Sequence, residues 1–271
     1  MDAPDLLAPT ALLVSIDDTD TVDSEYGTGR ISRFLADHLE STHGALQVAG
    51  SVRQQLLVDP RVPYTTHNSA ACLICEWPAD RKAEPVIETA ASFLADIAAE
   101  GSDPGLCVGR VEDVTPAVTG FGRDAGEVVL EEASAYDRAD GADLFLEEYG
   151  GTGEGVIGAL AAVGRTATGD LGRLIRYDSI RSFEGVVDVE TLWEHEIRVV
   201  DTEGQSLETG LVRTGGWVRP SFRDGRATLA VEREEAGATT PGTSEDTPAG
   251  AARVPPDAAG TEQYRPVNLD H

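Results

Sequence analysis

The chain has 271 residues, enough for one large or two modest domains that each bury a core. Its 48 Asp and Glu residues outnumber 21 Lys and Arg, and the formal net charge of −27 argues against non-specific binding to phosphate backbones. No stretch approaches the roughly 20 apolar residues that cross a bilayer, so no membrane partner is expected. Three cysteines are too few for a disulfide framework, which favours a cytoplasmic protein.

The acidic composition is also typical of a halophilic protein. Lys82 is the single lysine, and alanine and glycine are abundant. At about 1 M salt the Debye length falls to about 3 Å, so a high-salt cytoplasm makes the repulsion among acidic side chains tolerable. An ordinary acidic protein is the alternative.

The N-terminal half alternates apolar runs that suit strands with runs of helical spacing. A helix begins near Ile31 and ends at Gly44, a suitable C′ residue, and a second helix has Pro85 in its first turn. The order strand, helix, three strands, helix predicts an α+β fold. The strands are expected at residues 11–16, 46–52, 55–58, 69–77 and 106–111, and the second helix at residues 85–99.

The C-terminal half is predicted to be richer in strands. Residues 140–149 suit a helix or part of one, and Asp224-Gly225 is a hairpin signal between strands at 212–218 and 227–232. Other strands are expected at residues 174–177, 185–189 and 197–200. From Glu235 the sequence loses all apolar periodicity, which predicts a disordered acidic tail. The predicted division is therefore a domain at 9–150, a β-rich domain at 151–234 and a tail at 235–271.

The chemically most informative motif is Asp17-Asp18-Thr19-Asp20 at the end of the first apolar strand. Three neighbouring carboxylates raise one another's pKa unless a cation neutralises them. Mg²⁺ accepts one or two carboxylates together with water and phosphate oxygens. Asp17, Asp18 and Asp20 are therefore candidate metal ligands, with a solvated acidic turn as the alternative.

A glycine-rich segment precedes the apolar run 156–163. Glycine permits close backbone approach, and a helix N-terminus offers amide groups to a phosphate. Gly151, Gly153 and Gly155 are therefore candidate phosphate-binding residues. The segment is not a Walker A loop, because no Gly-Lys-Ser/Thr follows it. A linker or tight helix packing would explain the glycines equally well.

Basic and polar side chains gather around the loop 60–68. Arg53, Arg61 and His67 are candidate donors to an anionic ligand, although a plain surface connection is the alternative. Cys72 and Cys75 have the C-x₂-C spacing, but the apolar residues between them favour a buried strand over a zinc site.

Four motifs in this order resemble a known family. They are Val14-Ser-Ile-Asp-Asp-Thr-Asp20, Val58-Asp-Pro-Arg-Val-Pro-Tyr-Thr-Thr-His-Asn-Ser69, Asp103-Pro-Gly105 and Gly155-Val-Ile-Gly-Ala-Leu-Ala-Ala-Val163. Together they resemble the N-terminal half of the archaeal isoleucine tRNA agmatinylcytidine synthetase family, over residues 11–183.

The resemblance implies a kinase-like α/β domain joined to a ferredoxin-like domain, with ATP and Mg²⁺ as cofactors. Family members join agmatine to an anticodon cytidine through a phosphorylated intermediate. By resemblance, Asp17, Asp18 and Asp20 hold magnesium and nucleotide phosphates, with Asp18 also catalytic. The family's phosphate-accepting hydroxyl falls nearest Ser32, with Thr28 as the competing residue because the intervening loop is longer here.

The expected activity is ATP- and magnesium-dependent phosphoryl transfer or acceptor activation by a ligase- or kinase-like enzyme. The partner is a nucleotide, and the acceptor is an RNA or a small amine. The sequence has no paired CxxC motifs for the family's zinc ribbon and ends in an acidic segment, which predicts that the tRNA-binding modules are missing. The alternative is a catalytically silent nucleotide-binding or regulatory protein of the same fold.

Overall fold

A computed structural model describes residues 3–62, 68–234 and 262–267. The chain folds as two compact units: an N-terminal unit, Asp5–Tyr177, and a C-terminal unit made of Met1–Pro4 and Asp178–His271. The predicted boundary at residue 150 is therefore too early. The segment after it forms a helix and a strand that belong to the N-terminal unit, because their apolar faces pack on its sheet.

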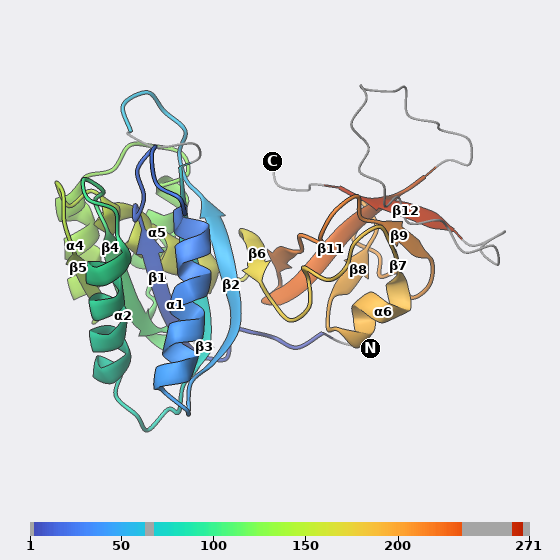
Figure 1. Cartoon of the computed structure of the whole chain (residues 1–271), viewed down its shortest axis with the longest axis horizontal. Helices are drawn as coiled ribbons and strands as arrows, with labels where there is room; N and C mark the ends of the chain where they lie inside the picture. The colour runs from blue at the N-terminus through green and yellow to red at the C-terminus, as the bar shows by residue number, and fades with distance from the viewer. Residues whose placement is uncertain (1–2, 63–67, 235–261, 268–271) are drawn as a thin grey trace. The chain divides into compact units, whose positions relative to one another are not determined.

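The N-terminal unit is built on one antiparallel sheet (Figure 1). Its strand order is β5-β4-β1-β3-β2-β6, and every neighbouring pair is antiparallel. The strands are β1 (Leu12–Asp17), β2 (Gln47–Gln55), β3 (Ser69–Glu76), β4 (Gly105–Arg110), β5 (Phe145–Glu148) and β6 (Arg173–Arg176). β1 is wholly buried at the centre of the sheet, as its uninterrupted apolar run predicts.

Helices cover both faces of this sheet. The α1 helix (Thr28–Thr42) and the α2 helix (Glu84–Ile97) lie on one face, where Ile31, Leu35 and Leu94 join a core with alternate residues of β1. The opposite face carries the α5 helix (Gly155–Ala167), on which the α3 helix (Pro116–Asp124) and the α4 helix (Glu132–Asp140) pack. The resulting three layers place the end of β1 between α1 and α5.

The C-terminal unit has the strand order β10-β11-β12-β9-β7, with β8 parallel to β11. The Asp224-Gly225 hairpin is confirmed, but it joins β10 to β11, and the strand expected at 212–218 is confined to β9. The elements are β7 (Val186–Asp188), α6 (Val189–Glu194), β8 (Arg198–Val200), β9 (Leu211–Arg213), β10 (Ser221–Arg223), β11 (Arg226–Arg233) and β12 (Gln263–Pro266).

The expectation of a disordered tail is wrong for β12. This strand pairs antiparallel with β11 and parallel with β9, and it buries Tyr264 to 5% exposure. Arg265 forms an ion pair with Glu232 at 2.7 Å. A four-residue strand gives no periodic signal of its own, because its partners supply most of the stabilising contacts. The remaining tail positions, 235–261 and 268–271, lie outside the described residues.

Three further expectations differ from the structure. The predicted helix at 140–149 is the end of α4 followed by strand β5, and the predicted strand at 55–58 is a non-strand connection after β2. The α3 helix was not predicted, because Gly120 and Gly122 lower its helix propensity while its contacts with α5 stabilise it.

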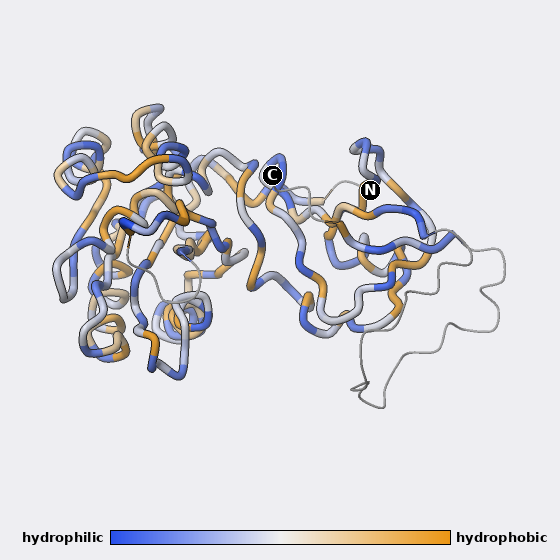
Figure 2. Tube along the Cα trace, turned by 90° about the horizontal axis from the view of Figure 1, so that it is seen from above, coloured by the Kyte–Doolittle hydropathy of each residue, from blue (hydrophilic) through white to orange (hydrophobic). Residues whose placement is uncertain are grey.

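The mixed α and β composition is confirmed. Within the described ranges, no helix is long and apolar enough to cross a membrane. Along the trace in Figure 2, hydrophobic and hydrophilic stretches alternate over short distances, as expected for elements that bury one side.

Candidate functional site

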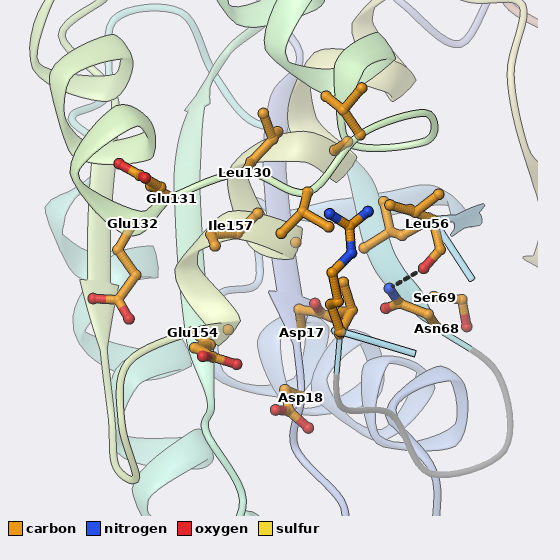
Figure 3. A pocket seen from close by; sticks show the side chains of 18 of the residues that line it. Asp17, Asp18, Leu56, Asn68, Ser69, Leu130, Glu131, Glu132, Glu154 and Ile157 are labelled. Carbon is orange, nitrogen blue, oxygen red and sulfur yellow. Dashed lines mark hydrogen bonds between the residues drawn. The ribbon is translucent and has the colours of Figure 1, made fainter. Parts of the chain in front are cut away.

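A pocket of about 370 Å³ opens in the N-terminal unit where β1 ends, α1 begins and α5 begins. Carboxylates form much of its polar wall, and Figure 3 shows Asp18, Glu154 and Glu132 toward one side with Leu130 toward the other. The lining residues are Asp17, Asp18, Asp20, Thr28, Leu56, Leu57, Arg61, Val62, Asn68, Ser69, Ala125, Val128, Val129, Leu130, Glu131, Glu132, Glu154, Gly155, Ile157 and Gly158.

Asp17 is the last residue of β1, and its side chain faces α5. Oδ2 of Asp17 lies so close to the helix backbone that a Cβ on Gly158 would approach it to 1.7 Å. A side chain at this point of α5 would therefore displace the Asp17 carboxylate. Burial, with smaller contributions from the charges of Asp18 and Asp20, raises the pKa of Asp17 from 3.8 to about 8.

Asp18 turns the chain away from β1 with a φ of 48°. A left-handed conformation is uncommon for a residue with a side chain, and such strain is found preferentially at functional sites. Burial raises the pKa of Asp18 to about 6, and the carboxylates of Asp103, Asp20 and Glu154 act in the same direction. The end of β1 thus gathers carboxyl groups whose ionised form a bound cation would stabilise.

Asp20 points to the start of α1 and holds Thr28. Its Oδ1 accepts hydrogen bonds from the backbone N–H and from Oγ1 of Thr28, each at 2.8 Å. Thr28 Oγ1 also accepts a bond from Thr19 Oγ1 at 3.1 Å. Asp20 therefore caps α1 and places a hydroxyl group in the pocket wall.

The expected three-carboxylate metal site is not preformed. In the part of the chain that the structure describes, no three His, Cys, Asp or Glu side chains gather closely enough to hold a metal ion. Asp20 also lines the pocket, but its Oδ1 is engaged by Thr28 at the start of α1. Asp17 and Asp18 share the pocket and are the two candidate ligands that remain.

Ser32 is not part of the pocket. It is fully buried, its Oγ donates to the carbonyl of Gly29 at 3.1 Å, and it lies 3.3 Å from Ser51 Oγ of β2. The position four residues after Thr28 is turned toward the sheet, so the structure brings Thr28 rather than Ser32 to the site.

The glycine segment divides into two parts. Gly155 lines the pocket and approaches the carbonyl oxygen of Asp103 so closely that a Cβ would lie 1.9 Å from it. Gly151 and Gly153 do not line the pocket. The backbone N–H groups of Thr152 and Gly153 donate to Asp103 Oδ1, so the amides that were expected to face phosphate hold a carboxylate of the protein.

The basic candidates are separated. Arg61 lines the pocket, and its guanidinium binds Asp59 through Nε and Nη2 at 2.8 and 2.9 Å, which lowers the pKa of Asp59 to about 2. Arg53 lies on β2, and its Nε donates to Ser69 Oγ at 2.9 Å, beside the pocket. His67 lies outside the described residues.

Several pocket residues were not predicted from the sequence. Glu131 and Glu132 reach the pocket from the start of α4, and Glu154 from the start of α5. Asn68 fixes the loop by donating to the carbonyl of Leu57 at 2.7 Å. No local motif marks the three glutamates, because they come together only through the packing of α3 and α4 on α5, whereas Asn68 lies in the second of the four motifs quoted from the sequence.

The cysteines play no part in the pocket. Cys72, Cys75 and Cys107 are free and fully buried in the central strands. Burial raises the pKa of the Cys72 thiol to about 12, so the thiolate that a metal would require is strongly disfavoured.

Comparisons with known proteins relate this geometry to solved structures. No known family matches the sequence, and no curated protein matches it significantly. A crystal structure of a tRNA fluorescent labeling enzyme is 25% identical with a TM-score of 0.50, over 68% of this chain and 43% of that one. A complex of TiaS with its isoleucine tRNA and ATP is 22% identical with the same TM-score and coverage. Apo TiaS, an isoleucine-tRNA agmatidine synthetase, is 23% identical with a TM-score of 0.48, over 57% of this chain and 35% of that one. Part of this chain has a TiaS-like fold.

The resemblance expected from the four motifs is therefore confirmed at the level of the fold. The chain spans less than half the length of these solved structures. Among the TiaS structures, one complex contains the isoleucine tRNA and ATP, and another contains the same tRNA with AMPCPP and agmatine.

Proposed function

We propose that the pocket binds ATP with Mg²⁺ and that the protein transfers a phosphoryl group or activates an acceptor, in chemistry related to tRNA cytidine agmatinylation. The observation that carries the proposal is the convergence of Asp17, Asp18 and the Thr28 hydroxyl on one pocket. The TiaS-like fold, which in its solved relatives is found with ATP, supports it. The acceptor is an RNA or a small amine. In this proposal the N-terminal unit is the kinase-like domain, and the C-terminal unit corresponds to the ferredoxin-like domain.

Thr28 is the proposed phosphoryl acceptor. Its Oγ1 attacks the γ-phosphorus of ATP, and its proton passes to Asp20 Oδ1, which already accepts the hydroxyl hydrogen bond at 2.8 Å. A bond forms between Oγ1 and phosphorus, the bond from phosphorus to the bridging oxygen breaks, and ADP leaves with that electron pair. Such a reaction needs mainly positioning and charge neutralisation from the protein.

The carboxylates of Asp17 and Asp18 fit a divalent cation, because burial and neighbouring carboxylates raise the pKa of both. When bound, Mg²⁺ would neutralise phosphate oxygens that these carboxylates otherwise repel. The apolar side chains of Leu56, Leu130 and Ile157 line the same pocket and offer a surface for the nucleobase.

Phosphorylation of the protein itself tests the proposal. Thr28→Val keeps the side-chain shape and removes the hydroxyl, so incubation with γ-labelled ATP and Mg²⁺ should leave it without label. Ser32→Ala is the matched control and should be labelled like the wild type, because Ser32 lies outside the pocket. Label retained by Thr28→Val, or lost only from Ser32→Ala, would contradict the role of Thr28.

A catalytically silent nucleotide-binding protein is the second candidate. One observation favours it: Thr28 Oγ1 is already engaged by Asp20 and Thr19, which restrains it from attack. Such a protein would bind ATP with Mg²⁺ but would show neither label on Thr28 nor turnover in the presence of RNA or amines.

A further inference from the structure

Two arginines and a tryptophan form a stacked group on the surface of the C-terminal unit. The guanidinium carbon of Arg181 lies 4.1 Å from the centroid of the Trp217 ring, and that of Arg219 lies 4.7 Å from the same centroid. Both distances fall within the about 6 Å over which an aromatic ring attracts a cation. Arg181 and Arg219 are exposed, and Trp217 is half-buried. We call these three side chains the Trp217 stack.

The Trp217 stack is held by two chain segments that lie against each other. The backbone N–H of Val218, in the loop after β9, donates to the carbonyl of Ile180, in the turn after β6, at 3.1 Å. Both of these residues are 1% exposed. Each adjoins members of the stack in the sequence and anchors them, while the stack itself remains accessible to solvent. The fold therefore supports the stack on an ordered frame before any ligand binds.

The exposure of Trp217 distinguishes it from the other two tryptophans of the chain. Trp77 and Trp193 are 6% and 7% exposed, and the indole N–H of each donates to a backbone carbonyl, at 3.1 and 2.7 Å respectively. Those two rings belong to the packed interior. Trp217 instead leaves part of its ring in solvent between two cationic groups, which is the arrangement that proteins use to bind the flat faces of nucleobases.

The surrounding charge indicates that stacking is the main interaction that this surface offers. The chain carries a net charge of −27, and Asp178 and Glu184 lie within a few residues of Arg181 in the sequence. Long-range attraction of a phosphate backbone is therefore weak. The face of a guanidinium or an indole ring binds a base without such attraction, while the cations suit the phosphodiester between successive bases. An acidic peptide would use the cations but not the ring.

We propose that the Trp217 stack binds unpaired bases of a single-stranded RNA. A base stacks on the exposed part of the Trp217 ring or on the outer face of a guanidinium. In a double helix the faces of the bases are covered by their neighbours, so only unpaired nucleotides fit. The inference rests on the proposed function only in taking the RNA, and not the small amine, as the acceptor. Binding itself requires neither ATP nor phosphoryl transfer.

Fluorescence anisotropy of labelled octaadenylate RNA, with the full chain and without ATP, measures the affinity. Trp217→Ala should lose about tenfold or more. Arg219→Lys keeps the charge but removes the planar group, so it should lose about threefold or more. The control is Arg81→Lys in the N-terminal unit, whose guanidinium lies 5.4 Å from the centroid of the buried Trp77 ring. This variant should bind like the wild type.

Salt dependence and two further probes separate stacking from attraction to charge. Two phosphate contacts would weaken binding by about 25-fold between about 0.2 and 2 M KCl, because the logarithm of the affinity falls by about 0.7 per contact for each tenfold rise in salt. We expect a change of less than about fivefold. A blunt RNA duplex and inorganic polyphosphate should both bind at least about tenfold more weakly than octaadenylate.

The proposal is overturned if the wild type does not bind octaadenylate, if Trp217→Ala keeps its affinity, or if Arg81→Lys weakens as much as Arg219→Lys. It is also overturned if polyphosphate or the duplex binds as tightly as octaadenylate, since the surface would then bind anions in general, acidic peptides included. None of these results depends on ATP or on labelling of Thr28, so the two proposals fail separately.

Discussion

Replacement of Gly158 by alanine tests the position of Asp17 most directly. In a helix interior, alanine is more favourable than glycine by about 1 kcal/mol. Here, however, the new Cβ would lie 1.7 Å from Oδ2 and 2.5 Å from Cγ of Asp17. Asp17 belongs to β1, which is paired on both sides, so its backbone cannot retreat. The carboxylate must rotate out of its buried position or α5 must shift.

Forcing an extra methyl group into a packed interior costs about 1–3 kcal/mol, so Gly158→Ala should change the free energy of unfolding by about 0–2 kcal/mol in the destabilising direction. The displaced carboxylate should also weaken binding of ATP with Mg²⁺ by about tenfold or more, about 1.4 kcal/mol. Chemical denaturation measures the first quantity and calorimetry measures the second.

Gly120→Ala is the matched control, because Gly120 lies in α3 and a Cβ there would meet nothing within 4 Å. This variant should gain about 0.4–1 kcal/mol of stability and bind ATP like the wild type. If Gly158→Ala were stabilised as much as Gly120→Ala and bound ATP unchanged, Asp17 would not lie against α5, and the proposed cation site would lose one of its two ligands.

Three further outcomes are expected. Because the pKa of Asp17 is about 8 in the folded chain against an ordinary value of 3.8, its protonation stabilises the fold at low pH. Without divalent cations, this contribution should be lost as the pH rises toward and through about 8, by about 1.4 kcal/mol per pKa unit at most, and Asp17→Asn should flatten the stability-against-pH curve. Tyr264→Ala should destabilise the C-terminal unit by about 3 kcal/mol, since it empties the space between β12 and Gly210; an unchanged denaturation midpoint would show that β12 contributes little. The melting temperature should rise between low and molar KCl as repulsion among the acidic side chains is screened, and a flat or falling trend would contradict the electrostatic argument.

Strong local patterns predicted most of the N-terminal unit. β1, β3, α1 and α2 lie within a few residues of their expected limits, because continuous apolar runs and helical spacing report burial directly. Elements stabilised mainly by distant partners were missed or misassigned. The α3 helix depends on contacts with α5, β5 on pairing with β4, and β12 on two strands distant from it along the chain.

The sequence predicted several of the residues that form the site but not how they are arranged. The placement of Asp17 and Asp18 at the end of a buried strand follows from the abrupt change from apolar to acidic residues. The choice between Thr28 and Ser32 depends on where α1 begins, and the bond from Thr28 to Asp20 determines that point. The remaining pocket residues belong to helices and loops far apart along the chain, so their proximity has no counterpart in a linear pattern.

The contact of Asp103 with the glycine segment means that the protein carries its own substitute for a bound anion. The carboxylate of Asp103 occupies the N–H groups of Thr152 and Gly153, so this loop has its shape before any ligand arrives. A phosphate that approached these N–H groups would have to displace the Asp103 carboxylate, which is part of the chain and therefore always close to them. Whether a ligand binds there would then depend on the difference between its binding free energy for these N–H groups and that of the Asp103 carboxylate. A weakly charged ligand would leave Asp103 in place.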